Sequence, residues 1–306
     1  MITGILTEGF IYSIMVLGVF MSYRILNFAD LTVDGSFPMG AAIMAVFLTK
    51  GFPPIAALGL AFLGGSLAGL VTSLIHTRLK VPDLLSGILT MTMLYSINLR
   101  IMSNRANVSL LKVPTLFTRF AETFSFMDKS TAILLLCFLA AIIIKILFDL
   151  FFHTDYGLSL GALGANPQLI ISQGMNPDVL KISGICFSNG LVAVAGSFTA
   201  MYQGFADAAL GHGVIVSGLA SLMVGEILIR SNRIGIQTLR VILGSILYRG
   251  LMYLARDFGY IIKMTPNDLQ LITGLLIILC IFISKNDILN TFRKRRAEGQ
   301  ARGQYD

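Results

Sequence analysis

The chain has 306 residues, of which 55% are hydrophobic and 13% carry a charge, against about 25% charged residues in an ordinary soluble domain. Together with a mean hydropathy of +0.80, this composition excludes a water-soluble fold. The apolar runs reach about twenty residues, the length at which a helix crosses a hydrocarbon core about 30 Å thick. A membrane β-barrel would show short segments of alternating polarity instead. We therefore predict an all-α polytopic membrane protein.

The charge is concentrated near the C-terminus. The chain carries 23 Lys and Arg against 16 Asp and Glu, a net charge of +7, and the segment 285–306 holds the cluster Arg293, Lys294, Arg295 and Arg296. A basic cluster that follows a membrane span is typical of a cytoplasmic tail in contact with anionic lipid. We expect membrane lipid as a partner of this tail, and no nucleic acid.

About nine spans, between eight and ten, are predicted from the apolar runs. They cover residues 2–22, 36–50, 53–75, 84–102, 131–152, 180–201, 214–229, 235–255 and 269–284. With the tail inside, this count places the N-terminus and the loop 103–130 outside and the loop 153–182 inside. We expect 1–284 to form one transmembrane domain, followed by the basic tail.

The second predicted span is interrupted. Pro38 and Gly40 lie within it, and Pro53 and Pro54 follow soon after. Broken helices at membrane depth are tolerated where protein or a water-filled cavity satisfies their backbone. We expect a short or re-entrant helix beside a transport pathway.

A sequence motif occurs twice. Phe28-Ala29-Asp30 recurs as Phe205-Ala206-Asp207, each copy after one span and before a short one. The predicted topology places the copies on opposite sides of the membrane, so the halves 1–130 and 180–284 would be inverted repeats with Asp30 and Asp207 in corresponding positions. Inverted repeats are typical of transporters. The alternative is a chance match of a short tripeptide.

A polar group lies beside the interrupted span, at Asn27, Asp30, Thr32, Asp34 and Ser36. A zwitterionic ligand needs a helix N-terminus for its carboxylate and an acidic or carbonyl group for its amine, and this segment offers both. We expect these residues to line a substrate pathway, with a matching outer set at Gln203, Phe205, Asp207 and His212. The alternative is that Asp34 or Ser36 caps the following helix.

Other polar residues favour structural roles. Arg230 follows Glu226 at the i,i+4 spacing of a helical ion pair, and Asp149 follows Lys145 in the same way. Glu8 has no such neighbour, and would lie at the outer interface or in a cavity. The histidines His76, His153 and His212 and the cysteines Cys137, Cys186 and Cys280 are scattered. Their spacing predicts neither a metal site nor a disulfide framework.

The loop 153–182 contains a short helix with recognisable ends. Asn166 and Pro167 are typical of an N-cap and first helical position, and Gly174 of a stop, so we expect a helix over 167–173. Its apolar residues, Leu169 among them, are too few to cross a membrane. A short rigid helix suits docking into the groove of a cytoplasmic partner. The alternative is a helix that lies on the lipid surface.

The same loop resembles a known family. Gly161, Ala165, Asn166, Pro167, Gly174, Met175 and Asn176 resemble the cytoplasmic signature of the branched-chain amino-acid and ribose permease superfamily of ATP-binding-cassette (ABC) importers. The segment 26–38 resembles the early motif of the tryptophan/tyrosine permease subgroup. The resemblance implies a permease homodimer, two cytoplasmic ATPase subunits that hold ATP and Mg²⁺, and an extracytoplasmic substrate-binding protein or lipoprotein. The expected ATPase-coupling residues are Gly161, Gly164, Asn166, Pro167, Leu169, Gly174 and Asn176.

The sequence therefore favours the membrane-spanning subunit of an importer in a bacterial inner or cell membrane, carrying an aromatic amino acid. A G-x-x-x-x-G-K-[ST] phosphate-binding loop is missing, so we expect no catalytic residue, resident cofactor or metal in this chain. Within the class, a nucleoside or sugar is the alternative substrate. The competing class is a self-sufficient secondary transporter, which would need coupling-ion sites in its spans and no docking helix.

Overall fold

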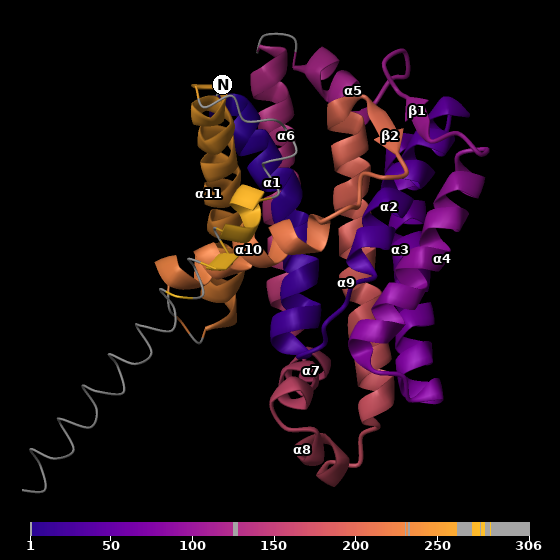
Figure 1. Ribbon diagram of the computed structural model, residues 1–306, viewed down its shortest axis with the longest axis vertical. Helices are drawn as coiled ribbons and strands as arrows, with labels where there is room; N and C mark the ends of the chain where they lie inside the picture. Colours follow the sequence, from indigo (N-terminus) through magenta and orange to yellow (C-terminus); the bar gives the residue numbers. More distant parts are fainter. Residues whose placement is uncertain are drawn as a thin grey trace, which may run out of the picture.

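The computed structural model describes residues 2–124, 128–229, 231, 233–261, 271–275, 277, 278 and 282. The fold consists of helices and one two-stranded sheet (Figure 1). In chain order the elements are α1 (Ile2–Val19), the π-helix η1 (Phe20–Ile25), α2 (Val33–Thr49), α3 (Pro54–Leu79), α4 (Asp83–Ile101), β1 (Asn107–Ser109), α5 (Leu116–Thr123), α6 (Lys129–Phe152), α7 (Asp155–Ala165), α8 (Pro167–Ser172), α9 (Pro177–Gln203), β2 (Phe205–Asp207), α10 (Val214–Leu228) and α11 (Ile234–Ile261).

The predicted spans agree with these helices. Within the described residues, α1 with η1, α3, α4, α6, α9 and α11 are long and apolar enough to cross a membrane, and α2 and α10 are shorter apolar helices. Eight of the predicted spans are thus confirmed as helices. The ninth, 269–284, lies largely outside the described residues. Helices α5 and α7 were not predicted.

The order of elements is the same in the two halves of the chain. A long helix (α1, α9), a link carrying Phe-Ala-Asp, a short helix (α2, α10) and another long helix (α3, α11) follow one another. Helix α3 packs against α9, and α11 packs against α1. The first link lies at the end of the molecule near α7 and α8, whereas β2 lies at the opposite end (Figure 1). This is the arrangement expected of inverted repeats.

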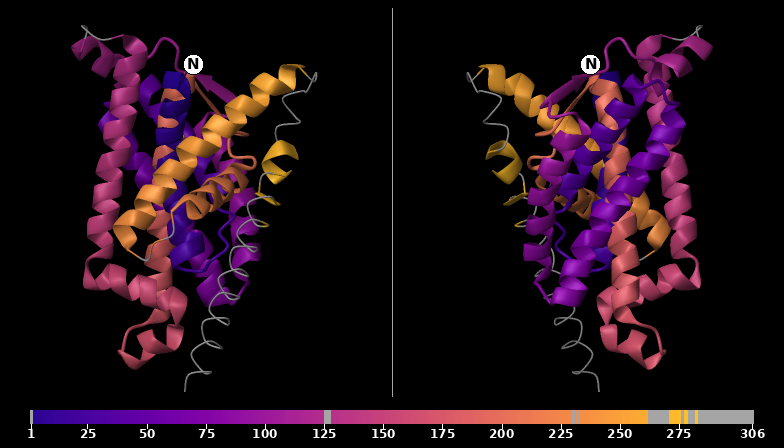
Figure 2. Two further views of the ribbon diagram at one scale, coloured as in Figure 1. Left: turned by 90° about the vertical axis from the view of Figure 1, so that its left-hand side faces the viewer. Right: turned by 90° about the vertical axis from the view of Figure 1, so that its right-hand side faces the viewer.

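The two ends of the molecule separate the loops as the topology predicted. Strand β1 pairs antiparallel with β2, with Asn107 opposite Asp207, so the loop 103–130 lies beside the second link. The N-terminus lies at this same end, and α7 and α8 lie at the other (Figure 1). In the left view of Figure 2, α11 runs obliquely to α6, and α10 lies against α11.

Helix α1 contacts α9 and α11 in the same way, each time through a glycine of α1 and a serine of the other helix. Ser188 Oγ of α9 donates to the Gly18 carbonyl at 2.7 Å, and Ser245 Oγ of α11 donates to the Gly9 carbonyl at 2.9 Å. A Cβ at Gly18 would lie 2.7 Å from Ser188 O, and one at Gly9 would lie 2.9 Å from Ile246 Cα. Small residues allow membrane helices to approach closely and to bond across the interface.

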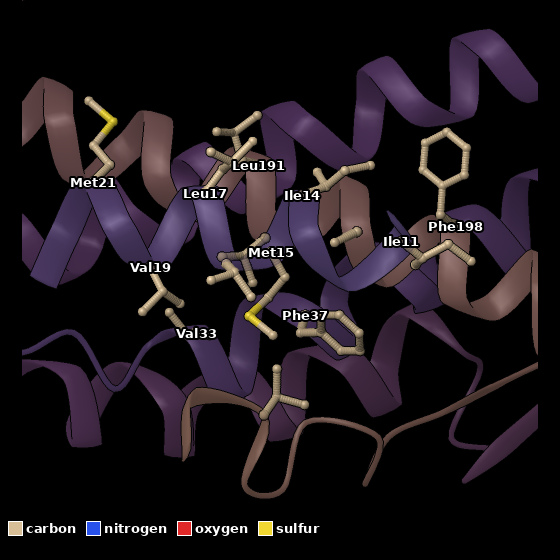
Figure 3. Close-up of a cluster of buried hydrophobic side chains, with 14 of the residues drawn as sticks. Ile11, Ile14, Met15, Leu17, Val19, Met21, Val33, Phe37, Leu191 and Phe198 are labelled. Atoms are coloured by element: carbon tan, nitrogen blue, oxygen red, sulfur yellow. The ribbon is translucent and has the colours of Figure 1, made fainter. Parts of the chain in front are cut away.

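The apolar core lies where α1, α2 and α9 meet. Side chains of α1 such as Leu17 gather with Val33 and Phe37 of α2 and Leu191 and Phe198 of α9 (Figure 3). Phe37 is fully buried and Leu191 is 6% exposed. The core therefore fixes the short helix α2 against the centre of the molecule.

Helix α1 ends in a π-helical turn. Leu26 N–H donates to Met21 O at 3.0 Å, an i→i+5 bond, and Asn27 then takes a positive φ of 51°. A π-turn holds one more residue than an α-helical turn and is often found at functional sites. The turn directs the chain from α1 toward the link that precedes α2.

Candidate functional site

A pocket of about 310 Å³ lies between the first turns of α2, the second half of α4 and the segment after β2. It is lined by Asp34, Gly35, Pro38, Met91, Thr92, Tyr95, Asn98, Ala208 and His212. We call it the α2–α4 pocket. Its volume is about ten times the roughly 30 Å³ of one water in the liquid, enough for a small solute. The pocket brings together segments from both halves of the chain.

Asp34 joins the two halves at this pocket. Its Oδ2 accepts from Gly213 N–H at 3.1 Å and its Oδ1 from Ile215 N–H at 2.8 Å, which are the N-cap and second residues of α10. A carboxylate at this position is stabilised by the unpaired N–H groups and by the helix dipole. Asp34 thus caps α10, whereas the alternative stated from the sequence was a cap on its own helix, α2.

Pro38 explains why α2 approaches the second half so closely. Proline has no N–H to donate to the carbonyl four residues earlier, which here belongs to Asp34. Gly211 packs against that carbonyl, since a Cβ at Gly211 would lie 1.8 Å from Asp34 O. The predicted interruption of the second span is therefore a helix that continues through Pro38 and presents this carbonyl to the opposite half.

The α4 wall of the pocket was missed by the sequence analysis. Asn98 is fully buried, and its Nδ2 donates to Gly35 O at 3.1 Å, whereas its Oδ1 has no hydrogen-bond partner among the described residues. Tyr95 is 48% exposed and Thr92 is also exposed. The signal was in the sequence, since the polar side chains Thr92, Tyr95 and Asn98 follow one another at a spacing of three residues within a predicted span.

Asp30, Thr32 and Ser36 belong to a buried hydrogen-bond network rather than to the lining of this pocket. Asn189 of α9, which the sequence analysis did not select, donates from Nδ2 to Asp30 Oδ2 at 2.6 Å and accepts from Ser36 Oγ at 2.7 Å. Thr32 N–H donates to Asp30 Oδ1 at 2.9 Å, and its hydroxyl meets that of Thr72 in α3 at 2.6 Å. Each of these side chains is at most 1% exposed. The network ties α2 to α3 and α9.

Asp30 and Asp207 make the same local turn. Asp207 Oδ1 accepts from Ala209 N–H at 2.7 Å, two residues on, as Asp30 Oδ1 accepts from Thr32 N–H. Their surroundings differ, because Asp30 is buried and Asp207 is half-buried. This shared turn supports their equivalence in the two halves. Gln203, at the end of α9, and Phe205 and Asp207, in β2, lie at the β1–β2 end of the molecule. The Phe205 side chain is 37% exposed.

The short helix of the loop 153–182 forms as predicted. Helix α8 covers Pro167–Ser172, with Asn166 Oδ1 accepting from Gln168 N–H at 3.0 Å. Gly174 has a φ of +76°, and the N–H groups of Gly174 and Met175 donate to Ile171 O and Ile170 O. This pattern is a Schellman stop. Asn176 caps α9 in the same way, accepting from Asp178 N–H at 2.9 Å.

Helix α8 presents apolar side chains outward. Leu169 is 46% and Ile171 is 53% exposed, whereas Ile170 is buried. Helix α7, which precedes it, is seated on the end of α1: a Cβ at Gly164 would lie 1.7 Å from Ile25 O, whereas one at Gly161 would meet open space. Of the three glycines expected in coupling, Gly161, Gly164 and Gly174, Gly164 is therefore a packing contact.

A second, wider pocket of about 580 Å³ lies at the α7–α8 end. It is lined by Tyr23, Arg24, Ile25, Asn27, Phe152, Gly161, Gly164, Ala165, Ile234 and Gln237. Asn27, expected in the substrate pathway, lies here and not with Asp34. Asn27 and Asp34 are close in the chain, which predicted one shared site, but the part of the link that follows Asn27 leads Asp34 to a different pocket.

The intramembrane acids have partners on other helices. Glu226 Oε1 lies 3.0 Å from Arg24 Nε and 3.2 Å from Arg240 Nη2, so it joins α10 to η1 and α11. Its expected partner, Arg230, lies outside the described residues. The pair Lys145–Asp149 is confirmed, with a separation of 2.5 Å, and Thr238 Oγ1 also donates to Asp149.

Glu8 and His76, which were also singled out from the sequence, make an ion pair and a packing contact. Glu8 lies 3.8 Å from Arg249, whose guanidinium stacks over Tyr12. His76 lies in the last turn of α3, where its ring packs edge-on against Phe28. Among the described residues, His, Cys, Asp and Glu side chains form no group of three that could hold a metal ion.

Comparison with known proteins decides the family. Residues 1–282 match the family described as branched-chain amino acid transport system / permease component. The chain belongs to this permease family. The resemblance of the cytoplasmic loop is thus confirmed, and the chain is a multi-pass membrane protein of a transport family.

Two relatives and one solved structure extend this finding. The chain is 40% identical over 297 residues to the tyrosine transport system permease protein of Clostridioides difficile (strain R20291), covering 97% of this chain and 95% of the relative. It is 31% identical over 284 residues to an uncharacterised protein of Rickettsia prowazekii (strain Madrid E), covering 93% and 98%. The structure of PsaBC from Streptococcus pneumoniae in complex with Fab shares the fold, with a TM-score of 0.54, 13% identity and coverage of 91% and 90%.

Proposed function

We propose that this chain is the membrane-spanning subunit of an ATP-driven importer for an aromatic amino acid, with L-tyrosine as the first candidate. The observation that carries this proposal is the α2–α4 pocket, where polar groups of α4 meet the N-terminus of the opposite half's short helix. Family membership and the tyrosine transport relative support the same class of solute. Tyr95 and Met91 give the pocket an aromatic and a thioether surface on which a ring can pack.

The pocket lies between elements that can move against each other. Asp34 holds the first turn of α10, and the other end of α10 is tied to η1 and α11 through Glu226. Short helices beside a substrate site, with half-repeats that rock around it, are the basis of alternating access in transporters with inverted repeats. A tilt of α10 would change the pocket and the α7–α8 end together.

We propose that the partner ATPase drives this movement by pushing on α8. Its exposed residues Leu169 and Ile171 offer an apolar docking face, and its capped ends keep it rigid. Gly164 seats α7 on Ile25, so a displacement of α8 and α7 reaches the end of α1. The partner would be a cytoplasmic ABC ATPase, which holds ATP and Mg²⁺, while this chain itself carries neither.

A second copy of the chain would complete the pathway. Thr92 and Tyr95 form an exposed polar strip on α4, a span whose other exposed residues include Leu89 and Met93. Polar side chains within a span normally face protein or a water-filled path. A homodimer that pairs these strips would provide such a path.

The remaining parts of the proposal concern location. We place the chain in a bacterial inner or cell membrane, with the α7–α8 end and the basic tail 285–306 on the cytoplasmic side, where the tail contacts anionic lipid. The β1–β2 end, outside, would then receive solute from an extracytoplasmic binding protein or lipoprotein.

Reconstitution tests the proposal. The full chain, its ATPase subunit and its binding protein are placed in proteoliposomes, and uptake of radiolabelled L-tyrosine is followed with and without ATP. ATP-dependent uptake, reduced by unlabelled tryptophan or tyrosine but not by adenosine or ribose, is expected. Uptake by the chain alone, driven by an ion gradient, would instead show a secondary transporter. Competition by adenosine or ribose alone would show a different substrate class.

A further inference from the structure

We propose that Asn98 recognises the ammonium group of the transported solute, in an acceptor pair with the carboxylate of Asp34. This inference rests on the proposed function, because it assigns the substrate class of the same α2–α4 pocket. It adds Asn98 as a specificity-determining residue. This residue lies on α4, which contains neither copy of the Phe-Ala-Asp motif and no part of the cytoplasmic-loop signature.

The hydrogen bond to Gly35 fixes the orientation of the Asn98 amide. A backbone carbonyl can only accept, so the amide nitrogen of Asn98 must face Gly35 O, at 3.1 Å, and Oδ1 must face the other way. That oxygen belongs to a fully buried side chain that lines the pocket, and it has no partner among the described residues. Buried carbonyl oxygens are nearly always hydrogen-bonded, so we assign the missing donor of Oδ1 to the occupant of the pocket that Asn98 lines.

The neighbouring charge decides which donor fits best. Asp34 lines the same pocket, and each of its oxygens accepts one backbone N–H group from α10. An ionised carboxylate has about four acceptor positions, so Asp34 retains capacity for another donor. Lys and Arg are not among the lining residues that the structure describes, and His212 already engages the Ala209 carbonyl through Nδ1. The Asn98 amide oxygen and the Asp34 carboxylate together favour a ligand group that carries a positive charge and several hydrogen-bond donors.

An ammonium group has a positive charge and three N–H donors, enough to supply one to each acceptor. A hydroxyl could satisfy Asn98 but would gain less from the charge of Asp34. A carboxylate placed there would be repelled by both. The pocket thus favours amino compounds over deaminated analogues of the same shape.

Binding of three probes to the full chain in lipid nanodiscs tests this inference by titration calorimetry. The probes are L-tyrosine, tyramine, which lacks the carboxylate, and 3-(4-hydroxyphenyl)propionate, which lacks the ammonium. We expect the propionate to bind roughly a hundredfold more weakly than tyramine, because a site built for a hydrogen-bonding group rejects ligands without it. Equal binding of tyramine and the propionate would overturn the inference, as would a failure of all three to bind.

Variants of α4 then assign the effect to Asn98. Asn98→Leu should weaken tyramine binding about tenfold and leave the propionate unchanged, since one charge-assisted bond is lost. Asn98→Asp loses the bond to Gly35 but keeps an acceptor, and should still prefer tyramine. Thr90→Val on the same helix removes a buried hydroxyl bonded to Ser86 O, away from the pocket lining, and should change binding within about twofold. If Asn98→Asp binds tyramine as poorly as Asn98→Leu, the Gly35 contact is responsible and the inference fails.

The two proposals fail separately. Tyramine binding that depends on Asn98, without ATP-dependent tyrosine uptake in proteoliposomes, would retain the ammonium site and overturn the proposed function. Tyrosine uptake that is the same in the parent and in Asn98→Leu, with unchanged preference for tyramine over the propionate, would retain the function and overturn the ammonium site. Size-exclusion elution and Tm of each variant establish that it is folded.

Discussion

Asp34 in the first half of the chain holds the N-terminus of a helix in the second half, accepting from Ile215 N–H at 2.8 Å. The two residues are far apart in sequence, yet they meet at the edge of the α2–α4 pocket. Through this bond, one side chain of α2 holds the N-terminus of α10 in place. A change at this side chain should therefore affect both the stability of the fold and the shape of the site.

Replacing Asp34 by Asn should reduce uptake without preventing folding. Asparagine keeps one acceptor for the α10 N-terminus but loses the charge, which is worth about 0.3–1 kcal/mol at a helix terminus. We expect uptake at limiting substrate to fall about tenfold and the complex to assemble normally. Uptake equal to that of the parent would restrict Asp34 to a capping role. Asp207→Asn, in an equivalent turn whose side chain is not among the pocket-lining residues, is the matched control.

Replacing Ser36 by Ala should act on stability. The change leaves the Asn189 Oδ1 without the Ser36 hydroxyl that donates to it at 2.7 Å. Leaving a buried acceptor unsatisfied costs about 1–3 kcal/mol. We expect a lower Tm in detergent and an unchanged KM for the protein that remains folded. A raised KM at unchanged Tm would place Ser36 in the substrate pathway, as the sequence predicted.

Replacing Gly164 by Ala should disrupt the contact of α7 with α1. The added Cβ would lie 1.7 Å from Ile25 O, and backbone atoms cannot easily move aside. We expect ATPase activity of the reconstituted complex to lose its stimulation by substrate, with a loss of stability of about 1–3 kcal/mol from overpacking. Gly161→Ala, on the same helix and facing open space, is the control. Equal behaviour of the two variants would contradict the seating role of Gly164.

Replacing Pro167 and Leu169 together by Gly should uncouple the ATPase. The double change removes a rigid first helical position and an exposed apolar side chain from α8, at about 1 kcal/mol or more per site. We expect loss of ATPase co-purification and of substrate-stimulated hydrolysis. If both persist, and truncation after residue 284 abolishes them, the tail is the docking element instead.

Local patterns predicted the parts of this fold that depend on neighbouring residues. Apolar runs located the helices, and Asn166 with Gly174 bounded α8, because capping acts within one turn. Helix α7 was missed because its glycines lower its helix propensity, and packing on Ile25 supplies the stability instead.

Long-range partners could not be read from the sequence. The i,i+4 rule paired Glu226 with Arg230, which lies outside the described residues, but could not indicate its contacts with Arg24 and Arg240 on other helices. The polar segment around Asp34 was identified, but its division between a pocket and a buried network depends on Asn189, which lies in α9. Asn98 becomes part of the site only because α4 packs against the first turn of α2.

The π-turn at the end of α1 limits which insertions and deletions this chain can tolerate. The bond from Leu26 N–H to Met21 O closes a turn with one residue more than an α-helical turn, so removing one residue between them would restore an ordinary i→i+4 turn. Adding a further residue there would instead swing the Ile25 carbonyl by about 100° around the axis. Gly164 would then face a different atom, and α7 would lose its seat. The upper length of this turn is thus limited by a helix more than a hundred residues later in the chain, and related sequences with the same α7 contact should show no insertion there.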